Sequence, residues 1–312
     1  MLNFCSLYSG SSGNSLFVET ENTKLLIDAG VSSKKIENAL DGLNINPSLL
    51  DGILITHEHS DHVQGLGTFA KKFNVPVFVN SKTLDNMPKQ KDKIPQNIIK
   101  NFAIGDTFEI NDLKIKSFAI PHDAVNPCGF NISNNEKNIS IATDIGHMTK
   151  EILKVLEPSD FVLLESNYDP EVLKCSPYPY ILKSRIAGPN GHLPNELAGK
   201  TIAYLLKCNL KTAMLGHLSK ESNFPELAYK TVLDEVIAGN CKEDSLNLSV
   251  NRDAVQDGEH KGTRNHSISY SIPRGKDTFS ISYSDMKYHQ TINSMATPFI
   301  SSSHAKTVRG SW

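Results

Sequence analysis

Residues suited to chemistry are concentrated in one short stretch, DGILITHEHSDHVQGL at positions 51–66. An apolar run at 52–55 predicts a buried strand that ends at Thr56, and a helix is expected from Val63 onward. Between the two lie four candidate metal ligands, His57, His59, Asp61 and His62. The ends of strands are where α/β sheets usually bind ligands, so the position suits a site. Imidazole and carboxylate favour Zn²⁺, Mn²⁺ or iron rather than Ca²⁺ alone.

The spacing of these ligands allows two ions to be bound side by side. His57 and His59 lie two positions apart and can hold one ion. Asp61 and His62, one turn later, point elsewhere and can hold a second. Two ions roughly 3.5–4 Å apart form the usual arrangement for hydrolysing an ester or a phosphodiester. The stretch therefore predicts a hydrolytic metal centre that takes further ligands from elsewhere in the chain.

The string HEHSDH at 57–62 resembles the signature of the metallo-β-lactamase superfamily. The resemblance implies an α+β fold, namely an αββα sandwich in which two mixed β-sheets are flanked by helices. It also requires more ligands, and each candidate lies just past a predicted strand: His122 after 113–120, Asp144 after 139–143, and His217 after 212–215.

The expected ligand set divides between the two ions. One ion would be held by His57, His59 and His122, and the other by Asp61, His62 and His217. Asp144 is expected to bridge them, because a carboxylate has two oxygens and a histidine cannot bind both ions. With no cysteine among the donors, the two divalent ions would be Zn²⁺ or Mn²⁺.

Two shorter features precede the metal stretch. Asp28 ends a predicted strand at 24–27, and in the superfamily an aspartate here holds the metal loop by hydrogen bonds without touching metal. From the residues alone, Asp28 could also cap a helix over 31–41, and the two roles are compatible. The loop SGSSGNS at 9–15 could present backbone N–H groups to an anion or form an ordinary hairpin turn.

Three further stretches indicate a branch of the superfamily: SGSSGN at 9–14, the segment 176–196 and the segment 217–228. Together they resemble the bacterial YycJ/WalJ family over roughly residues 1–253. This resemblance implies a metal-dependent 5′-to-3′ exonuclease on double-stranded DNA, linked to an essential cell-wall two-component system. Two departures from the family pattern, Pro194 and the pair Gln64-Gly65, touch no ligand and bear on fine substrate preference rather than on activity.

Glu165 and His192 complete the candidate set. Glu165 follows a predicted strand at 161–164 and His192 follows a glycine, in positions that resemble the charge relay of ribonuclease Z. A histidine held by a carboxylate can protonate a leaving 3′- or 5′-oxygen near neutral pH. His192 could instead contact a substrate phosphate or cap a helix at 195–207. The catalytic residues are thus expected to be Asp61, Glu165 and His192.

Composition sets few limits on function. A hydrophobic content of 39% can supply a full core, and a formal charge of −2 neither supports nor excludes a nucleic-acid partner. The lysine-rich stretch 81–100 is either ordinary solvated surface or a phosphate contact. Five widely spaced cysteines indicate reduced thiols in the cytoplasm. The N-terminus lacks a basic leader and no apolar run approaches about 18 residues, so neither a signal peptide nor a membrane span is expected.

The last part of the chain does not fit this pattern. From about Asp253 the apolar periodicity ends, and residues 254–312 are rich in Ser, Thr, His and Lys. We expect a catalytic domain at 1–253 and then a tail that is disordered, an added peptide or the product of a shifted reading frame. Two pieces, 266–270 and 279–283, alternate like strands but have no obvious sheet to join.

These observations favour a dinuclear metal-dependent phosphodiester hydrolase, in the first place a 5′-to-3′ exonuclease on double-stranded DNA. The alternatives are a small-molecule metallohydrolase acting on a thioester, lactone or cyclic phosphodiester, a ribonuclease Z-like RNA endonuclease, and a non-catalytic binding or regulatory protein. Ribonuclease Z carries a flexible Gly/Pro-rich arm that grips tRNA, and none is found between His62 and His122. The complete ligand set argues against a non-catalytic protein.

Overall fold

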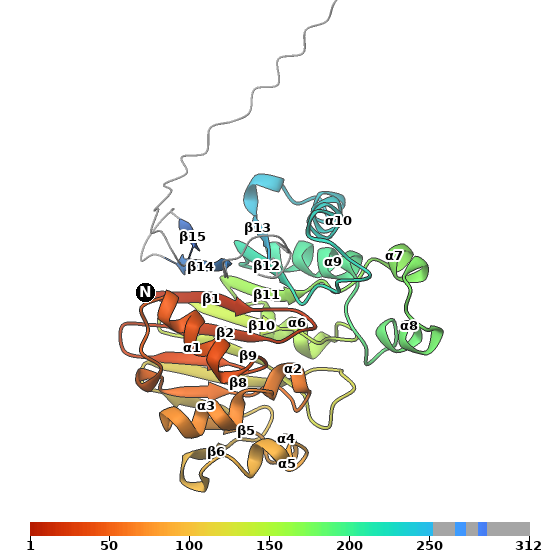
Figure 1. Ribbon diagram of the computed structural model, residues 1–312. Coiled ribbons are helices and arrows are strands. Elements are labelled where there is room, and N and C mark those ends of the chain that lie inside the picture. The colour runs from red at the N-terminus through yellow and green to blue at the C-terminus, as the bar shows by residue number, and fades with distance from the viewer. Residues whose placement is uncertain (252–265, 273–279, 286–312) are drawn as a thin grey trace, which may run out of the picture.

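Two β-sheets lie face to face, and their order in space differs from their order in the chain (Figure 1). The computed structural model describes residues 1–251 and the backbone of 266–272 and 280–285. The first sheet runs in the order β15 (Ser280–Asp285), β14 (His266–Ile272), β1 (Leu2–Tyr8), β2 (Ser15–Glu19), β3 (Lys24–Ile27), β4 (Gly52–Leu54), β5 (Val77–Val79) and β6 (Ile99–Asn101). The second runs β13 (Asn247–Val250), β12 (Thr212–Gly216), β11 (Phe161–Glu165), β10 (Asn138–Ala142), β9 (Cys128–Ser133), β8 (Leu113–Ala119) and β7 (Thr107–Ile110).

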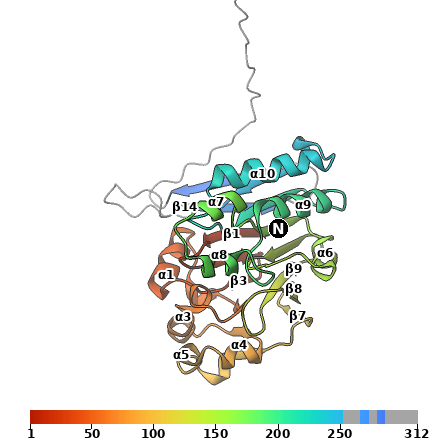
Figure 2. The same cartoon turned by 90° about the vertical axis from the view of Figure 1, so that its right-hand side faces the viewer.

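Helices cover the outer surfaces of this pair of sheets (Figures 1 and 2). They are α1 (Ser33–Gly42), α2 (Ser60–Val63), α3 (Leu66–Phe73), α4 (Ser81–Asp85), α5 (Pro88–Lys91), α6 (Lys150–Leu156), α7 (Pro170–Cys175), α8 (Tyr180–Ile186), α9 (Asn195–Leu206) and α10 (Pro225–Ala238). Short 3₁₀ turns lie at Pro47–Leu49, Gln96–Ile98 and Glu243–Ser245. Within the part of the chain described, none of the helices combines the length and the apolar character needed to cross a membrane.

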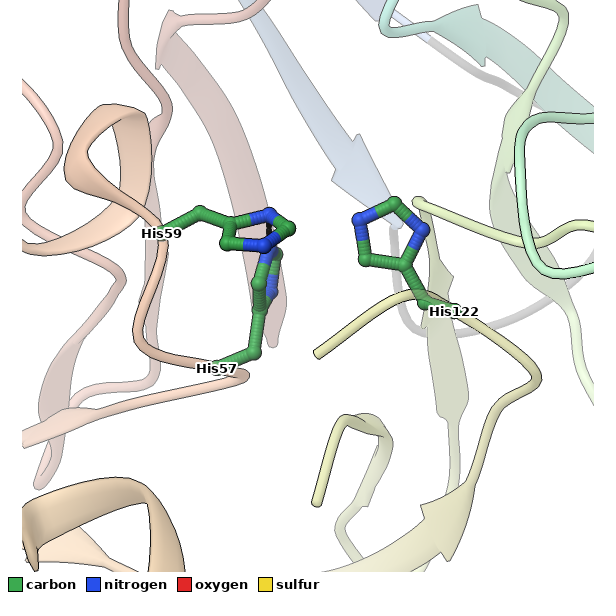
Figure 3. Close-up of side chains that lie close together, drawn as sticks. All are labelled: His57, His59 and His122. Carbon is green, nitrogen blue, oxygen red and sulfur yellow. Dashed lines mark hydrogen bonds between the residues drawn. The ribbon is translucent and has the colours of Figure 1, made fainter. Parts of the chain in front are cut away.

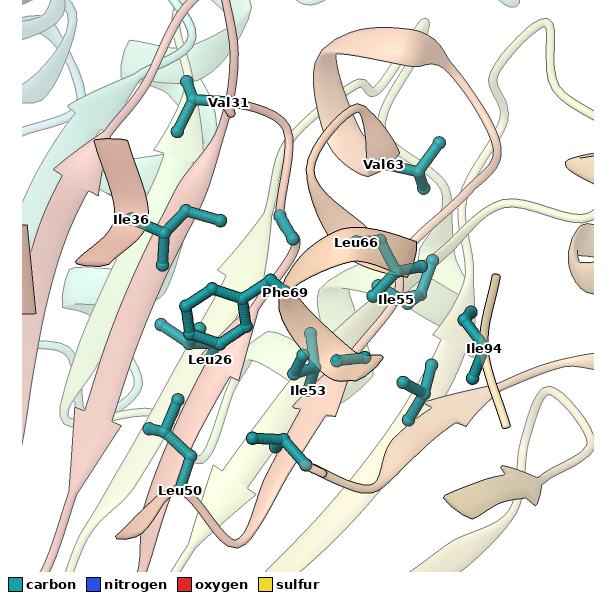
Figure 4. Packing of buried hydrophobic residues seen from close by; sticks show 14 of the residues in the cluster. Leu26, Val31, Ile36, Leu50, Ile53, Ile55, Val63, Leu66, Phe69 and Ile94 are labelled. Atoms are coloured by element: carbon teal, nitrogen blue, oxygen red, sulfur yellow. The ribbon is translucent and has the colours of Figure 1, made fainter. Parts of the chain in front are cut away.

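The layers follow from the alternation of side chains along the strands. Successive residues of a strand face opposite sides of the sheet, so β3 contributes to two cores. Leu25 and Ile27 pack between the sheets, whereas Leu26 packs with Ile36 of α1 and Phe69 of α3 on the outside (Figure 4). Every one of these side chains is fully buried.

The second sheet repeats the pattern. Phe161 and Leu163 of β11 pack between the sheets, and Val162 and Leu164 face outward into a cluster shared with α6, α9 and α10. Each sheet is mixed: β2 pairs with β3 antiparallel and β3 with β4 parallel, while β9 pairs with β10 antiparallel and β10 with β11 parallel. The expected αββα sandwich of two mixed sheets flanked by helices is confirmed.

The helix expected from Val63 onward is broken in the structure. α2 ends at Val63 and α3 begins at Leu66. Gly65 causes the break, because its N–H donates to the carbonyl oxygen of Ala29 and a Cβ there would lie 2.1 Å from the carbonyl oxygen of Val31. The chain therefore passes directly against the segment that follows β3, which fixes the end of the candidate metal loop.

The expectation that the two strand-like tail pieces have no sheet to join was wrong. β14 pairs antiparallel with β1, with Phe4 opposite Tyr270, and β15 pairs with β14. The outer edge of β1 has open backbone groups that a further strand can satisfy. The expected boundary at 253 and the expected disorder fall mainly on 252–265, 273–279 and 286–312, which lie outside the described residues.

Candidate metal centre

A buried carboxylate holds the loop that follows β4. Asp28 comes directly after β3 and has left-handed backbone (φ 62°), which aims its side chain at Thr56. Asp28 Oδ1 accepts from the Thr56 N–H at 2.9 Å, and Oδ2 accepts from the Thr56 hydroxyl and from His62 Nδ1, each at 2.7 Å. The alternative in which Asp28 caps α1 was wrong, because Ser32 is the cap.

These hydrogen bonds also set which ring nitrogens face the site. We assign the Nδ1 proton of His62 to Asp28 and that of His57 to the Thr56 hydroxyl oxygen at 3.0 Å. Each ring then has its lone pair at Nε2, the form that binds metal. His57 Nε2 lies 3.1 Å from His59 Nδ1, a separation that suits two nitrogen ligands on one ion.

The histidines from the second sheet are fixed in the same way. His122 Nδ1 lies 3.1 Å from the carbonyl oxygen of Gly191, and His217 Nδ1 lies 2.8 Å from Glu165 Oε1. Each ring therefore directs Nε2 away from its anchor. Figure 3 shows His122 facing His57 and His59 across the gap between the two loops. The structure thus brings together side chains about 65 positions apart.

The predicted residues meet in overlapping groups whose donor atoms lie within 4.8 Å of one another. One group is the expected first ligand set, His57, His59 and His122. A second is the expected other set, Asp61, His62 and His217. Asp144 joins His57 and His62 in a third, and joins Glu165, His192 and His217 in a fourth. All the residues predicted as ligands therefore converge on one place.

Asp144 lies between the two ligand sets. Its Oδ2 is 3.4 Å from His62 Nε2, and its Oδ1 is 3.7 Å from His122 Nε2 and 3.5 Å from His217 Nε2. Asp144 Oδ2 and His217 Nε2 are both buried and have no hydrogen-bond partner among the residues that the structure describes. A buried polar atom without a partner is costly, and a cation would satisfy both. The residues present therefore fit a pair of divalent ions.

The charged side chains of the site shift one another's pKa values. Burial opposes the charged form of His62, but Asp144 and Asp28 outweigh it and raise its pKa to about 9. Burial and the neighbouring histidines lower the pKa of His57 well below its usual value. Burial disfavours the Asp61 carboxylate, yet His217 and His62 lower its pKa below the ordinary range. The cluster thus combines anionic carboxylates with both charged and neutral imidazoles, which a metal would reorganise.

Glu165 anchors two histidines. It is fully buried; Oε1 accepts from His192 Nδ1 and His217 Nδ1, each at 2.8 Å, and Oε2 accepts from the N–H groups of Ile145 and Leu193. The expected Glu165–His192 pair is present, and the link to His217 is an addition. Because both oxygens are occupied, Glu165 positions ligands rather than offering itself as one. Burial raises its pKa, but His192 and His217 lower it further, leaving it below the usual range.

His192 lies beside the ligands but outside both expected sets. Its ring centroid is 5.2 Å from that of His122 and 5.3 Å from that of His217, and its Nδ1 is 4.0 Å from Asp144 Oδ1. The alternative in which it caps α9 was wrong, since Pro194 occupies the cap position without a side-chain bond. Its side chain keeps 18% exposure, which leaves it reachable from solvent.

Two residues that contact the expected ligands, Asn14 and Ser9, had not been predicted from the sequence to do so. Asn14, in the loop between β1 and β2, lies 3.4 Å from Asp61 Oδ2 and 3.0 Å from His62 Nε2 through its side-chain nitrogen. Ser9 accepts from the His217 N–H through its hydroxyl oxygen. The hairpin interpretation of 9–15 is correct, because β1 and β2 pair antiparallel, and residues at both ends of the turn also support the metal site. A polar residue in a glycine-rich turn was the only signal available.

Comparison with known proteins places the chain in a family. Residues 23–218 match the family described as Beta-lactamase superfamily domain, and residues 240–312 match the one described as Haemolysin secretion/activation protein ShlB/FhaC/HecB. The Zn²⁺-bound PqqB structure from Methylobacterium extorquens superposes with a TM-score of 0.61 at 15% identity, over 80% of this chain and 98% of that one. At that identity the likeness supports the fold alone.

Sequence relatives define the branch. The chain is 40% identical to Exodeoxyribonuclease WalJ of Streptococcus pneumoniae serotype 2 (strain D39) over 232 residues, 74% of this chain and 86% of the relative. It is 38% identical to Exodeoxyribonuclease YycJ of Bacillus anthracis over 231 residues, 74% of this chain and 88% of the relative. The chain is therefore a member of the β-lactamase superfamily and, within it, of the WalJ/YycJ family of metal-dependent hydrolases.

Proposed function

We propose that the protein is a dinuclear metal-dependent exodeoxyribonuclease that degrades double-stranded DNA from 5′ to 3′. The observation that carries this proposal is the position of Asp144 between two groups of three donors, with one buried oxygen left without a partner. Such an arrangement suits a pair of cations and the hydrolysis of a phosphodiester. The names of the relatives at 40% and 38% identity support DNA as the substrate.

The residues that would hold the ions are those brought together at the sheet ends. One ion would bind His57, His59 and His122, the other Asp61, His62 and His217, and Asp144 would bind both. All donors are nitrogen or oxygen, so Zn²⁺ and Mn²⁺ both fit. When bound, the pair would supply a water ionised near neutral pH and positive charge against the transition state.

Side chains of the protein would position the metal ligands and protonate the leaving oxygen. Glu165 holds the Nδ1 proton of His192, so the other nitrogen, Nε2, is available to pass a proton to the leaving oxygen. The same carboxylate holds His217, which ties the proton donor to a ligand at a fixed spacing. Asp28 and Thr56 keep His57 and His62 in the tautomer that binds metal. His192 is thus the proposed general acid, and Asp28 and Glu165 are positioning residues.

The experiment uses the full chain with Mn²⁺ or Zn²⁺ and one duplex labelled at either end. A 5′-to-3′ exonuclease releases a 5′ label at once as a mononucleotide, while a 3′-labelled strand shortens stepwise. Bis(p-nitrophenyl) phosphate and nitrocefin, offered in parallel, represent small phosphodiesters and lactams. Cleavage of a small ester with intact DNA would overturn the proposal, as would DNA cleavage that survives Asp61→Ala.

We also propose a cytoplasmic location. All five cysteines are free, and Cys5 and Cys128 are buried, which agrees with a reducing compartment. The link to a cell-wall two-component system stays a prediction from the family resemblance. It does not bear on the chemistry of the site.

A further inference from the structure

An open cavity of about 440 Å³ lies between α7 and α8, outside the candidate metal centre. Its walls include the rings of Tyr168 and Tyr180 and the apolar side chain of Leu173, and Lys174 and Lys183 stand at its rim. The volume falls in the range of about 300–1,000 Å³ that is usual for small-molecule sites. None of the roles assigned so far uses this cavity.

The cavity is joined directly to the loop that carries His192. The N–H of His192 donates to the carbonyl oxygen of Ile186 at the end of α8, and Tyr168 forms a backbone bridge with Pro194. The Glu165 charge reaches Tyr168, where burial first and then that charge raise the pKa of the phenol. Figures 1 and 2 show α7 and α8 together beside the start of α9. The cavity is therefore connected through the backbone to the segment that carries the proposed proton donor.

The cavity brings two tyrosines together with lysine side chains. Of the three cations between positions 170 and 190, Lys174 and Arg185 are paired with carboxylates, and Lys183 is the remaining one. Lys174 pairs with Glu171 at 2.6 Å, but the Lys183 ammonium donates to the Lys174 carbonyl oxygen and meets no carboxylate among the described contacts. Arg185 binds Asp123, the neighbour of His122, so this pair connects α8 to the mouth of the metal site.

The first turn of α8 exposes two large side chains. Tyr180 is 83% exposed and Ile181 is 82% exposed, the highest values among the large hydrophobic residues of the described chain. A contiguous exposed apolar patch often marks an interaction site, and this adjacent pair beside Lys183 suits a ligand that offers both a flat face and negative charge. Aromatic platforms with nearby cations are how proteins hold unpaired nucleotides without regard to sequence.

We propose that the cavity between α7 and α8 holds one unpaired nucleotide of the bound DNA, next to the nucleotide that is being cleaved off. Its base would stack on Tyr180 and Tyr168, and Lys183 would contact its phosphate. This inference rests on the proposed nuclease function, and it adds the path that the DNA strand takes across the protein. It also gives the enzyme a means of holding open the end of a duplex, since a base in the cavity cannot pair.

The test compares Tyr180→Ala and Lys183→Glu with matched surface controls, Tyr229→Ala and Lys71→Glu, in the full chain. Tyr180 and Tyr229 are both exposed, so neither truncation empties the core. Loss of one stacked base predicts about a tenfold rise in KM for DNA with kcat within about twofold. Hydrolysis of bis(p-nitrophenyl) phosphate is expected to stay unchanged, because that ester is too short to reach the cavity. Unchanged KM for DNA in both site variants overturns the proposal while leaving the nuclease function intact.

A second measurement is independent of catalysis. Fluorescence anisotropy of a labelled twelve-nucleotide single strand, with chelator present, reports binding alone. We expect about tenfold weaker binding by Tyr180→Ala, and by Lys183→Glu a smaller dependence of binding on salt. These losses support the proposal even if the wild-type protein cuts no DNA. Equal binding by the site variants and the controls, or no binding by the wild type, overturns it.

Discussion

The two sheets contribute to the candidate metal centre in different ways. The first supplies its donors from one six-residue stretch after β4, with His57 and His59 in the loop and Asp61 and His62 on α2, which begins earlier than the helix expected from Val63. The second supplies His122, Asp144 and His217 from three separate strand ends. The donors of the first sheet are therefore close together in the sequence, and those of the second meet only when its strands pair. The complete site requires the two sheets to pack together, with Asp144 of one sheet 3.4 Å from His62 of the other.

Each sheet nevertheless contains one buried carboxylate with the same task. Asp28 accepts from the Nδ1 of His62 and from a backbone N–H of the metal loop. Glu165 accepts from the Nδ1 of His217 and from two backbone N–H groups. The difference is that Glu165 also holds His192. Carboxylates of both sheets therefore hold metal-binding histidines in place, whereas the proposed proton donor is held by the second sheet alone.

The largest expected effect comes from removing a donor of either sheet. His59→Ala or Asp61→Ala on one side, and Asp144→Ala on the other, should each lower kcat for DNA on the order of 10³-fold or more, because the ions can no longer be held together. Circular dichroism should show a folded protein in each case. His147→Ala is the control, since His147 is exposed and lies away from the expected ligand sets, with its Nδ1 on the carbonyl oxygen of Pro189. Near wild-type activity in one of the three variants would remove that residue from the set.

The next effect separates proton transfer from metal binding. His192→Ala should lower kcat for DNA on the order of 10²-fold, the usual value of a general acid. The same variant should hydrolyse bis(p-nitrophenyl) phosphate nearly as fast as the wild type, because p-nitrophenolate leaves without a proton. Equal losses on both substrates would instead assign His192 to substrate binding.

A smaller effect is expected from changing the two buried carboxylates, Asp28 and Glu165, and it tests whether their roles differ. Asp28→Asn and Glu165→Gln should each weaken metal affinity about 10–100-fold, as is usual when the partner of a ligating histidine is lost. Only Glu165→Gln should also slow DNA cleavage at saturating metal, because only Glu165 holds the proton donor. Metal titrations followed by kcat measurements give both quantities. Identical behaviour of the two variants would contradict the asymmetry between the sheets.

The smallest expected effect is a pH dependence of the thermal stability of the protein after its metal has been removed. Asp144 and Asp28 outweigh burial and raise the pKa of His62 to about 9, so charged His62 stabilises the fold below its unfolded pKa near 6.5. That contribution is lost as the pH rises through about 9. Chelated protein should therefore lose roughly a few degrees of Tm between about pH 7.5 and 9.5. Metal-loaded protein should not, since a ligating imidazole is already neutral. A level Tm in chelator would contradict this account.

The parts predicted from the sequence are those encoded locally. The stretch after β4 carries its ligands within six positions, and the continuous apolar runs of β3 and β11 indicate strands that are buried on both faces. His122, Asp144 and His217 were found only because each follows a strand in a family whose pattern requires a donor there. The structure adds that Asp28, Asp144 and His217 all adopt left-handed backbone, with φ between 55° and 62°, which turns their side chains back into the site.

Other features could not be predicted because they depend on tertiary contacts. The double role of Glu165 requires His192 and His217 to arrive from different loops. The break between α2 and α3 requires the close approach of Gly65 to Val31. The pairing of β14 with β1 joins segments more than 250 positions apart, and no periodicity within either strand reveals its partner.

The central claim is that side chains from both sheets hold two cations together. The most direct test is the metal content of the full chain after loading with Zn²⁺ or Mn²⁺ and removal of excess ion, beside Asp144→Ala treated identically. We expect about two ions per chain in the wild type and a clear loss in the variant. A wild-type content of one ion or none, or two ions in both proteins, would contradict the account.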